Sequence, residues 1–451
     1  MEQLLHYVWR HKIFPLSGMQ TTDGQALEVI DTGLHNPDAG PDFFNAKIRI
    51  GGTLWVGNVE IHDRAADWYT HGHDRDAAYE NVVVHVVGAA DAEARTRGGR
   101  LLPQVVLGVP PSVAGHYAEL MKTAHYPPCH KVIPRLSRLT IHGWLSALQT
   151  ERLEQKTEAI LRRVARCGGD WASAYFVTLA RNYGFGINGD AFEQWAQAIP
   201  LQAVAHHRDN RFQVEAIFMG QAGLLEPESV PERHREAARR EGYFDRLAGE
   251  YRYLARKFGL APINAGVWRF LRLRPQNFPH IRISQLAGLY CDRRAGLGSL
   301  LEATTLKEMA QLFDTGVAPY WTTHYTFGSA SSQRPKRLSP HSVGLLMINT
   351  AIPMLFAYGR HHQSERLCDR ALAFLDELKA EDNAIVRLWS DCGLSVSTAG
   401  DSQALIQLRR QYCDRKDCLH CRIGYEYLCS DARDDLRTGH SDVAMLREGT
   451  P

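Results

Sequence analysis

Residues 43–62 read FFNAKIRIGGTLWVGNVEIH, and this stretch decides the fold of the first part of the chain. Its two halves, 43–50 and 53–62, are rich in β-branched and aromatic residues, which favour strands. Gly51-Gly52 stands between them, and a Gly-Gly pair is typical of a two-residue hairpin turn. We therefore predict two antiparallel strands that pair directly.

Working outward from this hairpin, further strand-like runs lie at Leu27–Ile30, Asn81–Val87 and Leu101–Leu107. The opening segment MEQLLHYVW has the apolar spacing of a helix, and the polar, aromatic residues 63–80 predict a loop with a short helix. The expected order is helix, strand, two-stranded hairpin, helix, strand. This order indicates an α/β domain.

The sequence changes character after a proline-rich stretch with Pro110-Pro111, Pro127-Pro128 and Pro134. From Leu139 onward, long segments keep the i, i+3, i+4 apolar spacing of helices, with Asp170 and Asp190 as predicted N-caps. We expect an α/β domain over residues 1–125 and a larger, mostly α-helical domain over residues 135–451.

Bulk properties limit the protein class. A chain of 451 residues exceeds the size at which single cores stop growing, about 250–300 residues. Its composition, 44% hydrophobic and 23% charged, is that of a globular protein. A net charge of +2 is too small to indicate a polyanionic partner. It contains no run of about 18 apolar residues and no signal-peptide pattern. We expect a cytoplasmic protein with no membrane partner.

The hairpin also carries a constellation of polar residues. Asp42 opens its first strand, and Glu60 and His62 close its second. Residues two apart in a strand share a face, so Glu60 and His62 project together, and hairpin pairing brings Asp42 beside them. Two carboxylates and an imidazole arranged in this way suit a divalent cation such as Mg²⁺ or Mn²⁺.

Pro41-Asp42, followed by Glu-x-His at the end of the next strand, resembles the PD-(D/E)XK nuclease superfamily, and the element order agrees with the αβββαβ core of restriction endonucleases. The resemblance implies that Asp42 and Glu60 bind metal. It also places His62 where the superfamily has a lysine that orients or activates the attacking water. A histidine can be neutral, a base or a metal ligand, so its role stays open. Glu2 and Glu28 are two candidates for the superfamily's helix carboxylate.

Three more histidines accompany this constellation: His71 and His73 in the loop, and His85 in the last core strand. Such imidazoles can bind metal, donate hydrogen bonds or protonate a leaving oxygen, and they can equally be surface or core residues. His85 has the better geometric claim to a catalytic role, because the superfamily's fourth strand runs beside the strand that carries Glu-x-His.

More broadly, the whole chain resembles a bacterial family of uncharacterised proteins, a domain-of-unknown-function family. The segments that carry this resemblance are AGPDFFNAKI, GNVEIH, the DW-HGH-D-Y run, RPQNFPHIRISQLAGLY and CLHCRIG. The resemblance implies a shared fold over both domains and implies no activity.

The helical region contains two basic stretches. The first has Arg269, Arg272, Arg274 and Arg282 interleaved with aromatic residues, and the second has Arg334, Lys336 and Arg337. Arginine with aromatic side chains can follow a nucleic-acid backbone, so DNA or RNA is a candidate partner. The alternative is a structured turn before an amphipathic helix, with the arginine stems packed along its face.

Four late cysteines form the pattern Cys413-x4-Cys418-x2-Cys421-x7-Cys429. Four thiolates suit structural zinc, C-x4-C-x2-C also matches an iron–sulfur spacing, and His420 is an alternative ligand. Buried or exposed free thiols are the remaining interpretation.

Three functional hypotheses follow. The leading one is a metal-dependent nuclease that hydrolyses DNA or RNA with Asp42, Glu60, His62 and His85 as catalytic residues. The second is a non-catalytic nucleic-acid-binding or scaffold protein built on a nuclease fold. The third is a histidine-rich metallohydrolase that acts on a small substrate.

Overall fold

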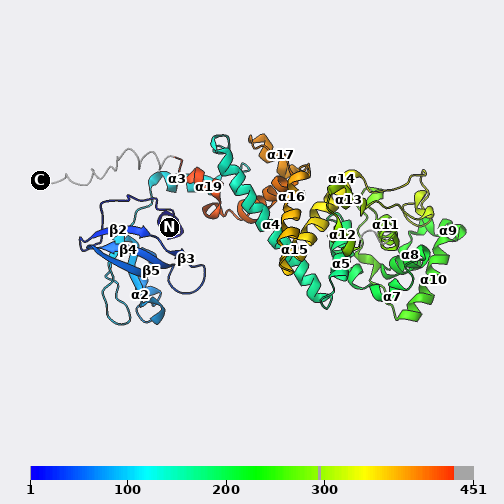
Figure 1. Ribbon diagram of the computed structural model, residues 1–451, viewed down its shortest axis with the longest axis horizontal. Coiled ribbons are helices and arrows are strands. Elements are labelled where there is room, and N and C mark those ends of the chain that lie inside the picture. The colour runs from blue at the N-terminus through cyan, green and yellow to red at the C-terminus, as the bar shows by residue number, and fades with distance from the viewer. Residues whose placement is uncertain (1, 293–295, 431–451) are drawn as a thin grey trace. The chain divides into compact units, whose positions relative to one another are not determined.

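The computed structural model describes residues 2–292 and 296–430 (Figure 1). The chain forms two compact units. The first comprises residues 1–141, 391–394 and 409 onward, and the second comprises residues 142–390 and 395–408. The predicted class, an α/β region followed by a mostly helical region, is confirmed.

A seven-stranded sheet forms the centre of the first unit and appears as the blue arrows of Figure 1. Its strands pair in the order β1-β2-β4-β5-β6-β7, and β3 pairs with β4. The strands are β1 (Met19–Gln20), β2 (Ala26–Asp31), β3 (Leu34–His35), β4 (Phe43–Ile50), β5 (Thr53–Arg64), β6 (Val82–Ala89) and β7 (Gln104–Val106).

The predicted hairpin is confirmed. β4 and β5 pair antiparallel with Ile50 opposite Thr53, so the turn consists of Gly51 and Gly52 alone. Both glycines have positive φ angles, 56° and 86°, which is the reason that glycine suits a tight turn between these strands. β5 then pairs with β6 in parallel, and Glu60 lies opposite His85. The sheet thereby brings two predicted site residues onto neighbouring strands.

Helix α1 (Glu2–Arg10) precedes the sheet and buries one face. Leu4, Leu5, Val8 and Trp9 are buried, whereas Arg10 is exposed. The indole N–H of Trp9 donates to the carbonyl of Thr32 (3.1 Å), so this large apolar side chain satisfies its polar atom inside the unit. The helix is thus fixed in place by its apolar face.

The remaining helices of the first unit are short: α2 (Asp67–Thr70), α3 (Pro111–Lys122) and α19 (Arg422–Leu428). The helical region consists of α4 (Arg138–Arg166), α5 (Trp171–Tyr183), α6 (Gly189–Gln197), α7 (Leu201–Ala205), α8 (Arg211–Gln221), α9 (Glu232–Glu241), α10 (Tyr243–Phe258), α11 (Pro279–Asp292), α12 (Leu297–Glu302), α13 (Leu306–Gln311), α14 (Pro340–Leu346), α15 (Ile352–His361), α16 (Glu365–Glu377), α17 (Ala384–Asp391) and α18 (Ala399–Gln407). One continuous hydrophobic core, from Leu153 to Ala399, joins most of them.

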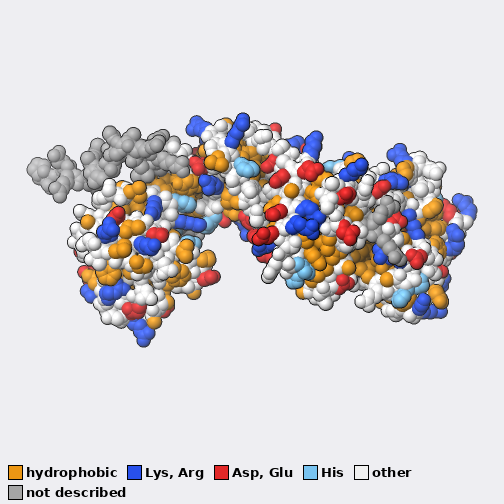
Figure 2. Space-filling model, in the orientation of Figure 1, with side chains coloured by type: hydrophobic (Ala, Val, Ile, Leu, Met, Phe, Trp, Pro, Cys, Tyr) orange, Lys and Arg blue, Asp and Glu red, His pale blue; other side chains and the backbone are white. Residues whose placement is uncertain are grey.

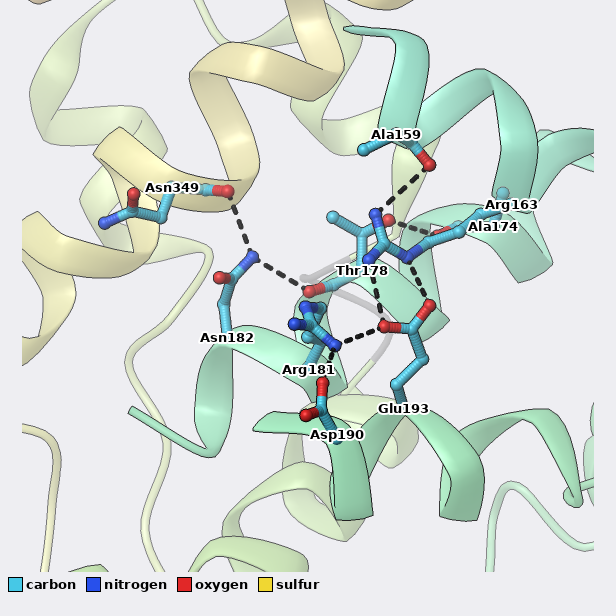
Figure 3. A network of polar contacts seen from close by, with 9 residues as sticks. All are labelled: Ala159, Arg163, Ala174, Thr178, Arg181, Asn182, Asp190, Glu193 and Asn349. Carbon is cyan, nitrogen blue, oxygen red and sulfur yellow. Dashed lines mark hydrogen bonds and ion pairs between the residues drawn. The ribbon is translucent and has the colours of Figure 1, made fainter. Parts of the chain in front are cut away.

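A network of ion pairs ties three of these helices together (Figure 3). Arg163 of α4 and Arg181 of α5 share the carboxylate of Glu193 in α6, at 2.8 and 2.6 Å. Asp170 caps α5 as predicted. Asp190, however, lies in the first turn of α6 and pairs with Arg181 at 2.6 Å, because the helix begins at Gly189. Arginines in this part of the unit therefore have carboxylate partners.

The run Pro340–His361 is long and apolar enough to cross a membrane. Its most apolar window is 67% buried inside the helical unit, as in a core helix of a soluble protein. The cytoplasmic location stays a prediction.

The late cysteine segment is placed differently from the sequence-based expectation. We expected it in the helical domain, but residues 409–430 belong to the same unit as the sheet. The reason is direct packing of this segment on α3 and the residues after it: the Lys416 ammonium donates to the carbonyl of Met121 (2.7 Å), and His116 Nδ1 lies 3.3 Å from the carbonyl of Leu428. The α/β unit is thus formed mainly by two segments that lie far apart in the sequence, before and after the helical unit.

Candidate functional site

Asp42 and Glu60 lie side by side at one end of strands β4 and β5. The backbone N–H of Asp42 donates to Glu60 Oε2 (3.1 Å), and the backbone N–H of Ile61 donates to Asp42 Oδ2 (2.8 Å). The Glu60 carboxylate therefore accepts from the backbone of Asp42, and the Asp42 carboxylate accepts from the backbone of Ile61, the residue after Glu60. This reciprocal pattern confirms that the hairpin brings the two predicted acids together.

Three histidines gather against these carboxylates. The ligand nitrogens of His62, His71 and His73 all lie within 4.8 Å of one another. His73 Nε2 is 3.2 Å and His62 Nε2 is 3.6 Å from Glu60 Oε1. His62 and His73 are buried and His71 is exposed, so the group opens to solvent at His71.

His85 stands behind His62. Its Nε2 atom is 2.8 Å from His62 Nδ1, and its Nδ1 atom is 3.3 Å from Gln104 Nε2. An amide nitrogen only donates, so in this orientation His85 Nδ1 accepts and His85 Nε2–H donates to His62 Nδ1. The hydrogen of His62 then resides on Nε2, which lies 3.1 Å from His71 Nδ1 and 3.6 Å from Glu60 Oε1. Rotation of the Gln104 amide reverses this chain and makes His62 Nε2 the acceptor.

Burial raises the pKa of both carboxyl groups. The pKa of Asp42 rises to about 6; the Ile61 N–H lowers it, and the nearby charge of Glu2 raises it further. The pKa of Glu60 is also raised by burial; the hydrogen bond from His73 lowers it, and the charge of Asp42 raises it. Two adjacent buried acids are costly to ionise without a cation beside them.

The buried imidazoles respond in the opposite direction. Burial, followed by the neighbouring His85, His73 and His71, lowers the pKa of His62 to about 3. Burial and His73 lower the pKa of His85 to about 3 as well. Both rings are neutral near pH 7. His62 therefore does not supply the fixed positive charge that a lysine would have in its position.

This donor set fits a divalent cation. Asp42 and Glu60 offer carboxylate oxygens, which suit Mg²⁺ or Mn²⁺, and the imidazole rings of His62, His71 and His73 offer nitrogens, which suit Zn²⁺. A buried carboxylate with neutral imidazoles around it is a common coordination set of metal sites. Zn²⁺ accepts both donor types, since proteins bind it through carboxylate oxygens as well as imidazole nitrogens.

A pocket of about 470 Å³ lies next to this site in the same unit. His6 of α1 connects the two, because it lines the pocket and its Nε2 atom lies 3.4 Å from Asp42 Oδ2. The pocket is also lined by Arg10, Arg415 and Lys416, against a single carboxylate, Asp417. Figure 2 shows histidine and basic side chains side by side on this unit. The pocket therefore offers net positive charge next to Asp42.

The two candidates for the helix carboxylate separate clearly. Glu2 of α1 interacts electrostatically with Asp42 and His6. Glu28 pairs instead with Arg49 across β2 and β4 at 2.6 Å, where both side chains are about half exposed. Glu2 is thus the acid that lies near the site.

The late cysteines have an additional neighbour. Cys418 and Cys421 flank a short turn in which the Cys421 N–H donates to the carbonyl of Cys418 (3.3 Å). Cys129, which follows α3, is buried, and its pKa is raised first by burial and then by the nearby thiols of Cys421, Cys413 and Cys418. Cys429 Sγ lies 3.8 Å from Tyr7 Oη. Zinc or an iron–sulfur cluster at these thiols stays a prediction, now with Cys129 beside them.

The predicted nucleic-acid-binding arginines do not form one surface. Arg269, Arg272 and Arg274 are exposed, whereas Arg282 is buried in α11. Arg274 and Arg282 line a pocket of the helical unit together with Lys336 and Arg337 of the second basic stretch. Arg334 backbone N–H donates to the carbonyl of Thr322 (2.9 Å). The two basic stretches therefore share one pocket, to which each contributes two of its basic residues.

Comparison with known proteins places the chain in a family. The family model described as protein of unknown function (DUF2851) matches residues 2–384. The chain belongs to the DUF2851 family. A search of curated proteins and a search of solved structures gave no match. The match to DUF2851 spans every residue of the acid and histidine site, and the cysteines at 413–429 lie beyond it.

Several contributors to the site were not identified from the sequence. Four side chains lie outside the hairpin. His6 lies near Asp42, Gln104 contacts His85, Arg10 lines the neighbouring pocket, and Cys129 lies near the late cysteines. The only sequence signal was the polar character of α1 on the face opposite its apolar stripe, with His6 and Arg10 four residues apart. For Gln104 and Cys129 we find no sequence signal.

Proposed function

We propose that the α/β unit is a metal-dependent phosphodiesterase that cleaves DNA or RNA, built on a restriction-endonuclease-like core. The order α1, β2, β4, β5, β6, with antiparallel, antiparallel and parallel pairing, supports this core. The observation that carries the proposal is the reciprocal locking of Asp42 and Glu60 beside neutral imidazoles and a basic pocket.

In this mechanism Asp42 and Glu60 would hold the cation, and His71 and His73 would complete its environment. A bound divalent cation supplies Lewis-acid stabilisation of the phosphoryl oxygens and a lowered pKa for water. His62, positioned by His85 and Gln104, would orient the attacking water or a phosphoryl oxygen in exchange for its contact with His71 (3.1 Å). Arg10, Arg415 and Lys416 attract the phosphate backbone toward Asp42.

The test is cleavage of a panel of duplex, branched and single-stranded DNA and RNA with Mg²⁺ or Mn²⁺. The variant Asp42→Ala is expected to lower the rate by about 10²–10³-fold, the size of effect seen when one stabilising group of an active site is removed, because the cation would lose one of its two carboxylate ligands. Asp38→Ala is the matched control, since Asp38 is an exposed acid of the same loop and lies outside the acid pair. Equal cleavage by wild type and Asp42→Ala on every substrate contradicts the proposal.

A second candidate function is hydrolysis of a small substrate by a histidine-bound metal. The convergence of His62, His71 and His73 within 4.8 Å favours it. It predicts tight retention of zinc or manganese that falls in His71→Ala, together with no affinity for nucleic acid. His142→Ala, at an exposed histidine of the helical unit, is the control.

The non-catalytic alternative keeps the basic pocket and removes turnover. Because His62 is neutral, the site lacks the lysine charge of an active superfamily member. This alternative predicts salt-sensitive nucleic-acid binding without cleavage in any divalent cation.

A further inference from the structure

The helical unit contains a second basic pocket, of about 280 Å³. Arg274, Arg282, Lys336, Arg337 and His341 are among the residues that line it, and none of its lining residues is an aspartate or glutamate. Arg337 also pairs with Asp314 at 2.7 Å, where both side chains are exposed. The charge of the pocket is therefore strongly positive.

Arg282 is the central feature of this pocket. It is only 4% exposed, and its guanidinium stacks over Phe185, 4.5 Å from the ring centroid. Its Nη atoms donate to the amide oxygens of Gln285 (2.9 Å) and Asn277 (2.6 Å), and its Nε–H is buried without a partner in the described chain. Both contacts are neutral, so the charge of Arg282 is not compensated by them.

This arrangement differs from that of other partly buried arginines in the same unit. Arg163 and Arg181 both reach the carboxylate of Glu193, as Figure 3 shows. Arg282 is more deeply buried than either, and it forms no ion pair with the described residues. An unpaired buried charge is strongly destabilising. The contrast indicates that its counter-ion comes from outside the described residues.

Lys336 is a second buried cation at this pocket, 4% exposed. Its ammonium donates to the carbonyl of His324 (2.6 Å) and lies 3.6 Å from the ring centroid of Tyr325. Burial lowers its pKa to about 8. Lys336 is thus a second buried cation that has only neutral partners among the described residues and lines the same pocket.

We propose that this pocket binds a phosphate group, supplied by a nucleotide or by the end of a nucleic-acid strand. The planar guanidinium of Arg282 retains an unused N–H, and arginine matches the geometry of phosphate oxygens. A volume near 300 Å³ accommodates a small ligand or one terminal nucleotide and excludes a duplex. The inference is independent of the chemistry of Asp42 and Glu60.

The experiment is calorimetric titration of the full chain with inorganic phosphate, with a 5′-phosphorylated mononucleotide, and with one oligonucleotide with and without a terminal phosphate. Potassium chloride at equal ionic strength controls for screening. The variants are Arg274→Ala, which removes an exposed arginine of the pocket, and Arg272→Ala, an exposed arginine of the same stretch that is not among the lining residues. Arg282→Gln, checked for folding by circular dichroism, is the third variant.

Binding of a phosphate-bearing probe that weakens by about tenfold or more in Arg274→Ala and is unchanged in Arg272→Ala supports the proposal. A folded Arg282→Gln that no longer binds supports it further. Preference for the mononucleotide or for the terminally phosphorylated strand identifies the source of the phosphate. Binding no stronger than that of chloride, or equal weakening in Arg274→Ala and Arg272→Ala, overturns it.

Discussion

His62 Nδ1 lies 2.8 Å from His85 Nε2, and His85 is fully buried. We therefore expect His85 to act on the candidate metal site through His62, as a positioning residue. Replacement by leucine is expected to lower the affinity for Mn²⁺ or Zn²⁺ by about 10–100-fold, because the ring of His62 loses its orientation.

Calorimetric metal titration measures this effect. His85→Gln, which can still hydrogen-bond to His62, is expected to recover part of the affinity, whereas a purely structural role would give the same affinity in both variants at equal unfolding temperature.

The basic pocket beside α1 makes a prediction about salt. Arg415→Ala is expected to weaken nucleic-acid binding on all sequences and to reduce the dependence of log affinity on log salt by about one. Fluorescence anisotropy over a salt series measures both quantities. Arg422→Ala, at an exposed arginine of α19, is the control, and identical slopes for wild type and Arg415→Ala would remove this pocket from the binding surface.

Close packing of β5 against β6 gives a stability prediction. A Cβ at Gly57 would meet Val83 Cγ1 at 2.4 Å and the carbonyl oxygen of Asn81 at 2.6 Å. Gly57→Ala is therefore expected to lower the free energy of unfolding by about 1–3 kcal/mol. Gly108→Ala, where a Cβ meets nothing within 4 Å, is expected to change it by no more than about 0.5 kcal/mol. Chemical denaturation of both variants measures the difference.

The cysteine segment makes a prediction about metal content. If Cys129 joins Cys413, Cys418 and Cys421 as a ligand, Cys129→Ser lowers the zinc or iron content of protein purified without added metal. Cys167→Ser, at a cysteine of the helical unit, is the control. Elemental analysis measures the zinc and iron content. Wild-type protein that contains neither metal would contradict metal binding at these cysteines.

Acid sensitivity of the helical unit follows from His280. Burial lowers its pKa to about 3, while the unfolded chain retains a value near 6.5. The unfolded state therefore binds the proton first, so the stability that this group contributes is present above pH 6.5 and is lost as the pH falls from 6.5 toward 3. The ring packs against Phe327 and Trp321 at 5.4 and 5.6 Å, so phenylalanine is a suitable replacement.

Relative to His280→Phe, wild type is expected to lose about 1.4 kcal/mol of unfolding free energy per pH unit below 6.5. Denaturation at several pH values measures this slope. Parallel curves for the two proteins would show that His280 is not the titrating group.

The sequence predicted the sheet well because its signals are local. Alternation and the Gly51-Gly52 turn define the hairpin, and the hairpin alone brings Asp42 and Glu60 together. His6 and Gln104 reach this site through packing of α1 and through parallel pairing of β6 with β7. Such contacts join distant residues without a local pattern, so they were not predictable from one sequence.

The helical unit illustrates the same limit. Arg274 and Arg282 were recognised as basic residues near an aromatic turn, but their meeting with Lys336 depends on tertiary packing. The sequence predicted Arg282 as a surface residue that follows a phosphate backbone. In the structure it is a buried arginine without an ion-pair partner among the described residues.

Residues 409–430 complete the unit that residues 1–141 begin. They leave the ribosome only after the helical unit has been made, so Arg415 and Lys416 reach the pocket beside Asp42 late in synthesis. Nascent chains therefore carry the acids and histidines without this part of the phosphate-attracting surface. The order of translation therefore delays completion of the proposed phosphodiesterase site, with its basic pocket, until the helical unit has been synthesised.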